Sequence, residues 1–280
     1  VLSLGIKITE KKITPSQLKR LQSASDLLIG SDGVNSIVRK NFSDQLLPRT
    51  HTSKLRFSWF TNETSQVRTE ACFYAFQAPE GVIMMTSYPL TDTKQVVIIE
   101  MTNKCLNSGK IRGKTPEMAI PYLNEILSSN GDKISLSPAN LPWYSFKMNT
   151  TTNLFHKNVA LIGDAAYSFH YSAGQGVTTA FTMGYSLAHC LQKNVDVNSA
   201  LVQYSRSMKM LLKKPEAKSL THTKWLEDVD THFLNTSDSD LIELFRQKEK
   251  FKSERGRINC SLNDNEGWRW FGIQFVIKKI

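Results

Sequence analysis

Two glycine–aspartate turns, each directly after a short apolar run, limit what this chain can fold into. The first turn is Gly30-Ser31-Asp32-Gly33, and the second, Gly163-Asp164, follows about 130 residues later. Unbroken apolar runs that end in a glycine turn are typical of buried parallel strands. After each turn, apolar residues recur at helical spacing, which predicts helices at Val34 to Phe42 and Val177 to Leu191. Ligands of open α/β sheets bind at the carboxyl ends of strands, so both turns are candidates for one site.

The residues between the two turns indicate a different architecture. Four closely spaced runs rich in aromatic and β-branched residues predict an antiparallel sheet, at 55–60, 71–77, 82–88 and 96–101. An amphipathic helix is expected at 115–128. The fold class is therefore a mixed α/β chain. We expect one α/β domain at 1–45 and 150–215, an inserted antiparallel sheet domain at 46–149, and a helical C-terminal region at 216–280.

Smaller features complete the expected organisation. The chain opens with a strand-like stretch at 2–8, and the pattern from Ser199 to Phe233 is helical with a break near Pro215. A charged helix is expected at 238–255. The stretch 268–277 is strand-like, but the pattern does not place it in a sheet.

Composition, charge and cysteine spacing limit the kinds of binding partner that are expected. The apolar fraction of 40% with 21% charged residues is typical of a folded globular protein. The net charge of +10 could suit an anionic partner, but the densest basic stretch, Arg246 to Arg257, is interleaved with acidic residues as on a solvated helix. No apolar run is long enough to span a bilayer. The four cysteines form no CxxC pair. We therefore expect a cytoplasmic protein without metal, nucleic acid or membrane partner.

The residues around the two turns resemble a known family. Asp26 to Arg39 is similar to the first motif, and Val159 to Ala166 with Gly174-Gln175-Gly176 to the second motif, of FAD-dependent aromatic hydroxylases related to 4-hydroxybenzoate hydroxylase. Order and separation agree with that family. The stretch Ser168 to Thr178, without the proline most members have there, resembles the subgroup of salicylyl-CoA and anthraniloyl-CoA hydroxylases and the violacein-pathway tryptophanyl hydroxylase. The resemblance covers about residues 25–233.

The resemblance implies a fold and an activity. It implies a Rossmann-like FAD-binding domain, present here in part, with an inserted substrate-binding sheet. The implied reaction uses NAD(P)H and molecular oxygen to hydroxylate an aromatic small molecule, which in this subgroup extends to a CoA thioester or an indole- or tryptophan-derived compound. The cofactor carries that chemistry, and the protein positions it.

It also implies the site residues. The cofactor-binding candidates are Asp32, Gly33, Arg39, Gly163, Asp164, Ala165, Gly174, Gln175, Gly176 and Val177, and the catalytic candidate is His170. Asp164 could accept hydrogen bonds from ribityl hydroxyls of FAD. Backbone amides where a helix begins after Gly176 could stabilise negative charge on the flavin. His170 could contact substrate or flavin.

Each assignment has a structural alternative. The glycines could serve only to make turns, Arg39 could be an outward, solvated side chain, and His170 could be a core histidine with a satisfied hydrogen bond. Four strand aromatics could line a substrate pocket or be ordinary core: Trp59, Phe73, Tyr74 and Tyr88.

One expected part of the family is missing from the sequence. The resemblance calls for an N-terminal strand, a GxGxxG turn and a helix, yet Gly5 is the single glycine before Gly30. We expect a missing N-terminal half, cut from the same chain or supplied by another, and no activity from residues 1–280 alone. The rival hypothesis is a non-catalytic remnant or interaction protein that keeps the fold without FAD. A basic nucleic-acid binder has only the net charge in its favour.

Overall fold

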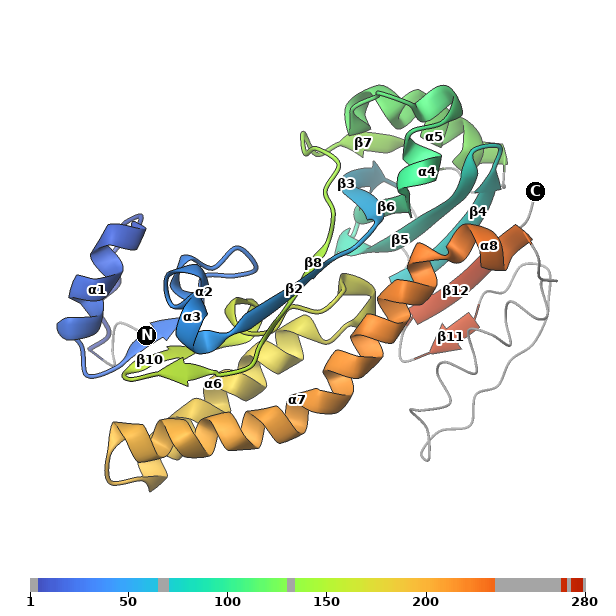
Figure 1. Cartoon of the computed structure of the whole chain (residues 1–280). Helices are drawn as coiled ribbons and strands as arrows, with labels where there is room; N and C mark the ends of the chain where they lie inside the picture. The colour runs from blue at the N-terminus through green and yellow to red at the C-terminus, as the bar shows by residue number, and fades with distance from the viewer. Residues whose placement is uncertain (1–4, 65–70, 130–133, 235–267, 271–272, 279–280) are drawn as a thin grey trace. The chain divides into compact units, whose positions relative to one another are not determined.

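The chain forms two compact units, each with its own sheet and core (Figure 1). The computed structural model describes residues 5–64, 71–129, 134–234, 268–270 and 273–278. The first unit comprises residues 1–51 and 147–221, and the second comprises 52–146 and 222–280. The mixed α/β class is as expected from the sequence. The functional division into three regions stays a prediction, and residues 222–280 group with the second unit.

The first unit is built on the two strands that precede the glycine–aspartate turns. Strands β1 (Leu28–Gly30) and β10 (Val159–Leu161) pair in parallel, with Leu28 opposite Val159 and Gly30 opposite Leu161. The prediction that both apolar runs are strands of a parallel sheet is therefore confirmed, and the structure adds that they are direct neighbours. Strand β9 (Phe155–His156) adds to the far edge of β10. A separate two-stranded sheet joins β2 (Pro48–Thr52) to β8 (Lys147–Thr151).

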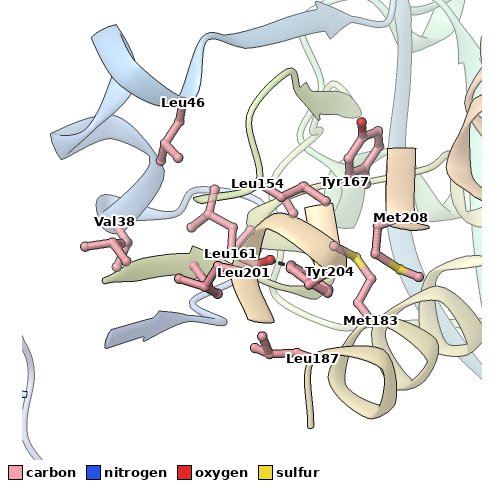
Figure 2. Packing of buried hydrophobic residues seen from close by; sticks show 14 of the residues in the cluster. Val38, Leu46, Leu154, Leu161, Tyr167, Met183, Leu187, Leu201, Tyr204 and Met208 are labelled. Atoms are coloured by element: carbon pink, nitrogen blue, oxygen red, sulfur yellow. Dashed lines mark hydrogen bonds between the residues drawn. The ribbon is translucent and has the colours of Figure 1, made fainter. Parts of the chain in front are cut away.

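Helices cover both faces of this small parallel sheet. Figure 1 shows α2 (Ile37–Asn41) and α3 (Ser43–Leu46) on one side of β10, and α6 (Gly176–Lys193) on the other. Helix α6 contributes Met183 and Leu187 to the buried core. Helix α7 (Val197–Glu227) contributes Leu201 and Tyr204 (Figure 2). The hydroxyl of Tyr204 donates a 2.8 Å hydrogen bond to the carbonyl of Leu161, which ties α7 to the end of β10.

The N-terminal stretch differs from its prediction. Residues 5–8 form no strand, so the strand expected at 2–8 is wrong over its described part. A helix that the sequence analysis missed, α1 (Pro15–Ser23), follows. Its signal was present, because Thr14 and Gln17 form a capping box in which the Thr14 amide donates to Oε1 of Gln17 at 2.9 Å. Apolar alternation without a partner strand does not make a strand.

The second unit contains the predicted antiparallel sheet. Its strand order is β11-β12-β4-β5-β6-β3-β7. The four predicted strands are confirmed and pair antiparallel: β3 (Leu55–Glu63), β4 (Ala71–Ala78), β5 (Gly81–Thr91) and β6 (Lys94–Thr102). Strand β7 (Leu136–Pro138) joins β3. The C-terminal stretch that the sequence did not place forms β11 (Trp268–Trp270) and β12 (Ile273–Lys278), and β12 runs parallel to β4.

Alternation along these strands divides the sheet into two faces. One face packs against α5 (Pro116–Ser129), close to the predicted helix, and includes Phe60, Phe76, Ile83, Met85 and Ile99. The other face packs Leu55, Ala75, Val82 and Met84 against the end of α7 and α8 (Val229–Leu234). Two short helices, α4 (Asn103–Leu106) and the 3-10 helix η2 (Gly109–Ile111), lead from β6 to α5.

The helical region at 199–233 is confirmed, but the expected break near Pro215 is wrong. Helix α7 continues through Pro215 and ends at Glu227. Buried residues on either side, Leu212 and Ser219, hold the helix in place there. A proline inside a helix costs about 3 kcal/mol, which favourable packing can offset. The helix expected at 238–255 lies outside the described residues.

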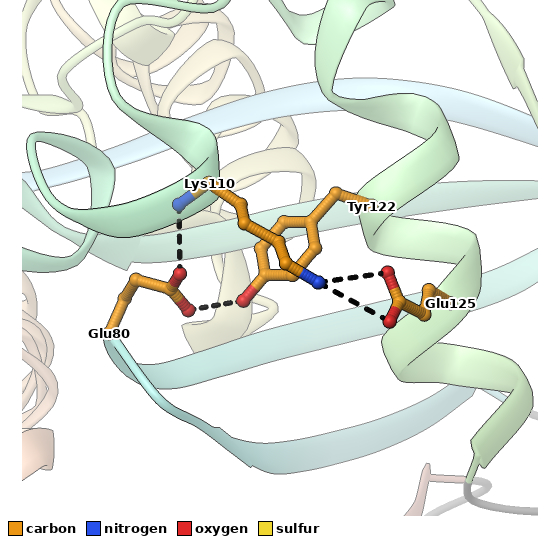
Figure 3. Close-up of polar contacts among 4 residues, drawn as sticks. All are labelled: Glu80, Lys110, Tyr122 and Glu125. Carbon is orange, nitrogen blue, oxygen red and sulfur yellow. Dashed lines mark hydrogen bonds and ion pairs between the residues drawn. The ribbon is translucent and has the colours of Figure 1, made fainter.

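A polar cluster fastens α5 to the turn between β4 and β5 (Figure 3). The buried Tyr122 donates its hydroxyl hydrogen to Glu80, and the backbone amide of Lys110 donates to the other Glu80 oxygen at 3.0 Å. Lys110 lies over the Tyr122 ring and pairs with Glu125 at 3.4 Å. Burial by itself would raise the pKa of the Glu80 carboxyl, but these hydrogen bonds outweigh it and the pKa is lowered.

Replacing Tyr122 by phenylalanine should destabilise the protein by about 1–2 kcal/mol, because it removes the donor to a partly buried carboxylate. Since the folded-state pKa of Glu80 is lowered, the cluster stabilises at pH values above the ordinary carboxyl range, and this contribution is lost on acidification. The variant should therefore lose part of the acid dependence of unfolding in urea. Glu125→Gln, which breaks only the exposed ion pair, is the control and should change stability by less than about 0.5 kcal/mol.

Candidate functional site

The first turn is held together by its own side chains. Oδ2 of Asp32 accepts hydrogen bonds from the backbone amides of Ile37 at 2.7 Å and Val38 at 3.3 Å. Ser36 caps the same helix by accepting from the amide of Arg39 at 2.9 Å. Asp32 therefore stabilises the start of α2, in keeping with the preference for carboxylates at helix N-termini. The neighbouring Gly33 occupies the left-handed region with φ +75°.

Arg39 lies where the sequence did not place it. The alternative of an outward, solvated side chain is wrong, since Arg39 is only 5% exposed, and its role in cofactor binding stays a prediction. One guanidinium nitrogen donates to the carbonyl of Ala165 at 2.6 Å and approaches that of Asp164 at 3.4 Å, and the other donates to the carbonyl of Val34 at 2.6 Å. Burial lowers the pKa of Arg39, while the charge of Asp32 opposes that shift.

The two turns meet in space, as predicted. Arg39 joins them directly, because its acceptors belong to both loops. A residue that the sequence analysis missed adds a second connection: Nδ2 of Asn149, on β8, donates to the same Val34 carbonyl at 3.0 Å. The backbone amide of Asn149 also donates to Oγ of Ser168 at 2.8 Å. Asn149 lies in no motif, so only the three-dimensional structure identifies it.

The second turn carries a carboxylate, that of Asp164, to which no described residue donates a hydrogen bond. Gly163 has φ +58°, and a Cβ atom there would lie 3.3 Å from Cβ of Ala180 on α6, so both the turn and the packing require glycine. Ala165 is buried, whereas Asp164 is exposed. No described residue donates a hydrogen bond to the Asp164 carboxylate. Partial desolvation raises its pKa.

The start of α6 lies beside that carboxylate. A Cβ atom on Gly176 would be 3.9 Å from Oδ1 of Asp164. Within the described part of the chain, the backbone amides of Gly176, Val177 and Thr178 have no hydrogen-bond acceptor, and Gln175 provides no side-chain cap. Oε1 of Gln175 is itself buried without a partner. Gly174, with φ +61°, turns the chain into this helix.

His170 is fully buried in the first unit. Its Nδ1 atom is 2.7 Å from Oγ of Ser172, and its backbone amide donates to Oγ of Ser219 on α7 at 3.2 Å. The ring also packs against that of Tyr171, with centroids 4.6 Å apart. These contacts hold the loop that leads to α6. A direct contact of His170 with substrate or flavin stays a prediction.

The strand aromatics separate onto two faces of the second unit's sheet. Trp59, Phe73 and Tyr88 share the face opposite α5. The register sets Trp59 opposite Ile98, Ile98 opposite Thr86, and Thr86 opposite Phe73. Tyr74 lies on the other face, where it stacks on Phe76 in the core. Including Tyr74 among the pocket candidates was therefore wrong, because neighbouring strand residues point in opposite directions.

The free groups fit part of a flavin. An exposed carboxylate can accept hydrogen bonds from the hydroxyls of a ribityl chain. Unpaired amides at the start of an 18-residue helix favour an electron-rich carbonyl edge or a negative charge. The groups of the first turn are used differently, since Asp32 and Arg39 bind the protein's own backbone. The described residues include no cluster of three or more metal-ligating side chains.

In the first unit, the loops after two parallel strands carry a carboxylate and helix amides that no described residue binds. This arrangement is typical of a domain that binds a nucleotide cofactor. Residues 8–215 match the model of the FAD binding domain family, and the chain belongs to that family. None of the helices described here is long and apolar enough to cross a membrane.

Two similar proteins are, by name, a hydroxylase and a monooxygenase. The chain is 24% identical over 211 residues to salicyloyl-CoA 5-hydroxylase of a Streptomyces species, a match that covers 72% of this chain and 40% of that protein. It is 21% identical over 226 residues to protodeoxyviolaceinate monooxygenase of Chromobacterium violaceum, covering 80% of this chain and 60% of the relative. The chain thus spans about half the length of these relatives.

Solved structures share the fold. The structure of 2-methyl-3-hydroxypyridine-5-carboxylic acid oxygenase has a TM-score of 0.58 at 17% identity and covers 72% of this chain, which spans 56% of that protein. A tetracycline destructase gives a TM-score of 0.53 at 16% identity, with 80% of this chain and 59% of that protein covered.

Proposed function

We propose that this chain provides the flavin-contacting and substrate-contacting parts of an FAD-dependent monooxygenase, which hydroxylates an aromatic small molecule with NAD(P)H and molecular oxygen. The observation that carries the proposal is the Asp164 carboxylate beside the amides of Gly176, Val177 and Thr178, none of which has a hydrogen-bond partner among the described residues. Family membership and the names of the relatives agree with it. Bound FAD would supply the oxygen-transfer chemistry.

The protein's own part in the reaction is to bind and orient. Asp164 would hold hydroxyls of the ribityl chain, and the start of α6 would hold the electron-rich edge of the flavin ring by its amides and dipole. Such groups are most effective when they are fixed before binding. The buried contacts of Arg39 and Asn149 provide that rigidity on the neighbouring backbone.

For the substrate, we propose a planar aromatic ring that contacts the sheet face bearing Trp59, Phe73 and Tyr88. Thr86 and Ile98 lie between Trp59 and Phe73 in the register, so a ring placed there would meet aromatic walls and one hydroxyl. The name of one relative, salicyloyl-CoA 5-hydroxylase, favours an aryl CoA thioester, and the subgroup resemblance extends the proposal to an indole-derived compound. Burial of the free thiols Cys105 and Cys190 fits a cytoplasmic location.

One further surface of the first unit favours a partner segment. Along α6, Val177, Phe181 and Tyr185 are 73%, 77% and 75% exposed at helical spacing, and we call this set the α6 stripe. Strand β1 pairs only with β10 among the described strands, and Ile29 on it is 43% exposed. We propose that a further strand and helix, from the same or another chain, cover this surface. An interaction protein without FAD is the second candidate, and the same surface is what favours it.

A flavin titration separates the two candidates. The protein completed by the proposed further strand and helix, incubated with FAD and freed of excess cofactor, should show the absorbance of bound oxidised flavin and lose it under NAD(P)H without oxygen. An accepted aromatic substrate should speed NADH or NADPH oxidation and take up one oxygen atom from labelled O2. Omitting the aromatic substrate is the control. A colourless protein that still binds a protein partner would favour the interaction role.

A further inference from the structure

We propose that Arg39 is a positioning residue: it holds the second turn, with Asp164, against the first turn, and so sets the affinity for flavin without touching the cofactor. This inference rests on the proposed function and replaces the direct cofactor contact that the family resemblance implied for Arg39. It concerns only groups within the first unit.

The geometry of the guanidinium group supports this role. Its hydrogen bonds go to the backbone carbonyls of Val34 and Ala165, one in each loop, both at 2.6 Å. Both nitrogens point into protein, and the side chain is almost wholly buried. A buried charge is costly unless its donors are satisfied. The planar fork of arginine can reach two carbonyls at once, whereas lysine carries a single donor centre.

Asn149 extends the connection three residues further along the chain, from Ala165 to Ser168. The Val34 carbonyl accepts from both Arg39 and Nδ2 of Asn149. Asn149 in turn binds Ser168, whose amide donates to the Asn149 carbonyl at 2.9 Å. The backbone that follows Asp164 is thus held at two places, Ala165 through Arg39 and Ser168 through Asn149, to the loop that carries the Val34 carbonyl. Asp164 itself keeps its carboxylate free.

The expected consequence is a loss of flavin affinity when the connection is removed. Arg39→Met should weaken FAD binding about tenfold or more, which is the range for hydrogen bonds with a charged partner. Arg39→Lys should weaken it by a similar factor, since lysine cannot bridge both carbonyls. Lys40→Met removes an exposed charge from the next position of α2 and should alter affinity less than about twofold.

Dissociation constants for FAD, measured by flavin fluorescence at several salt concentrations in the FAD-binding protein, test the proposal. Positioning predicts that both Arg39 variants bind weakly, keep the wild-type salt dependence and change the visible circular dichroism of the flavin. A direct contact with the pyrophosphate predicts instead that Arg39→Lys binds nearly as wild type and that Arg39→Met has a weaker salt dependence. That pattern would overturn the proposal.

A double-mutant cycle with Asn149→Ala provides the second measurement. Because both side chains act through the Val34 carbonyl, their effects on FAD affinity should be less than additive. Asn149→Ala and Arg39→Lys keep the test available if Arg39→Met does not fold. The proposal is contradicted if the effects of the two substitutions are additive, or if Asn149→Ala and Arg39→Lys both bind FAD with wild-type affinity. If the wild-type protein completed by the proposed further strand and helix binds no flavin, the proposed function fails, and this is distinct from a failure of the Arg39 role.

Discussion

Replacement of Asp164 by alanine should weaken FAD binding by about ten- to hundredfold. The substitution deletes an acceptor whose charge-assisted hydrogen bonds contribute about 1.5–3 kcal/mol. The carboxylate is exposed and has no described donor within the protein, so its loss should leave the fold intact. Fluorescence titration with FAD gives the affinity, and thermal unfolding of the cofactor-free protein shows whether stability is retained.

The same carboxylate should make flavin affinity depend on pH. Because desolvation raises the pKa of Asp164, its charged form is lost at a higher pH than for an ordinary aspartate. Affinity should therefore fall as the pH drops through that raised value, and it should be full above it. Asp164→Asn is the matched control, since it keeps an acceptor oxygen and cannot titrate in this range. Unchanged flavin retention in Asp164→Ala would place Asp164 among structural turn residues.

Residues 1–280 produced alone are expected to bind FAD poorly and to associate. Within these residues no GxGxxG turn offers backbone amides to a pyrophosphate. The open edge of β1 and the α6 stripe present unpaired backbone groups and apolar side chains, which favour association. Flavin retention after gel filtration and light scattering at increasing concentration measure the two effects.

Variants of the α6 stripe distinguish association of the chain from its weak flavin binding. Phe181→Ser with Tyr185→Ser should reduce association of residues 1–280 without restoring flavin binding. Met210→Ser changes a similarly exposed apolar residue of α7 outside the stripe and should have little effect. A monomer of residues 1–280 that retains one FAD per chain would show that another segment receives the pyrophosphate.

The sequence predicted those parts of the fold that depend on local patterns. Two apolar runs with glycine turns predicted the parallel strands β1 and β10, and closely spaced runs rich in aromatic and β-branched residues predicted the antiparallel strands. The position of the C-terminal strand could not be predicted, because β12 pairs with β4, which is distant along the chain. The path of α7 through Pro215 depends on packing on both sides of the proline, which a propensity argument does not include.

The candidate site was predictable to a smaller degree. The motif identified Asp164 and the turn before α6, whose groups are free in the structure. It did not show that Asp32 and Arg39 bind the protein's own backbone, because a motif specifies residue types and not their partners. Asn149 had no signal in the sequence, since its role comes from the meeting of β8 with both loops.

The packing around Gly30 limits how a duplicated copy of this protein could change in sequence. A Cβ atom at this position would lie 2.7 Å from a side-chain carbon of Leu161 and 2.9 Å from Cβ of Val38, so packing alone excludes any larger residue. A duplicated copy released from cofactor binding would still need this glycine to fold, but it could vary Asp164 without penalty. Among such copies, an intact Gly30 would therefore say nothing about flavin use, whereas the proposed role of Asp164 predicts that position 164 differs between copies that bind flavin and copies that do not.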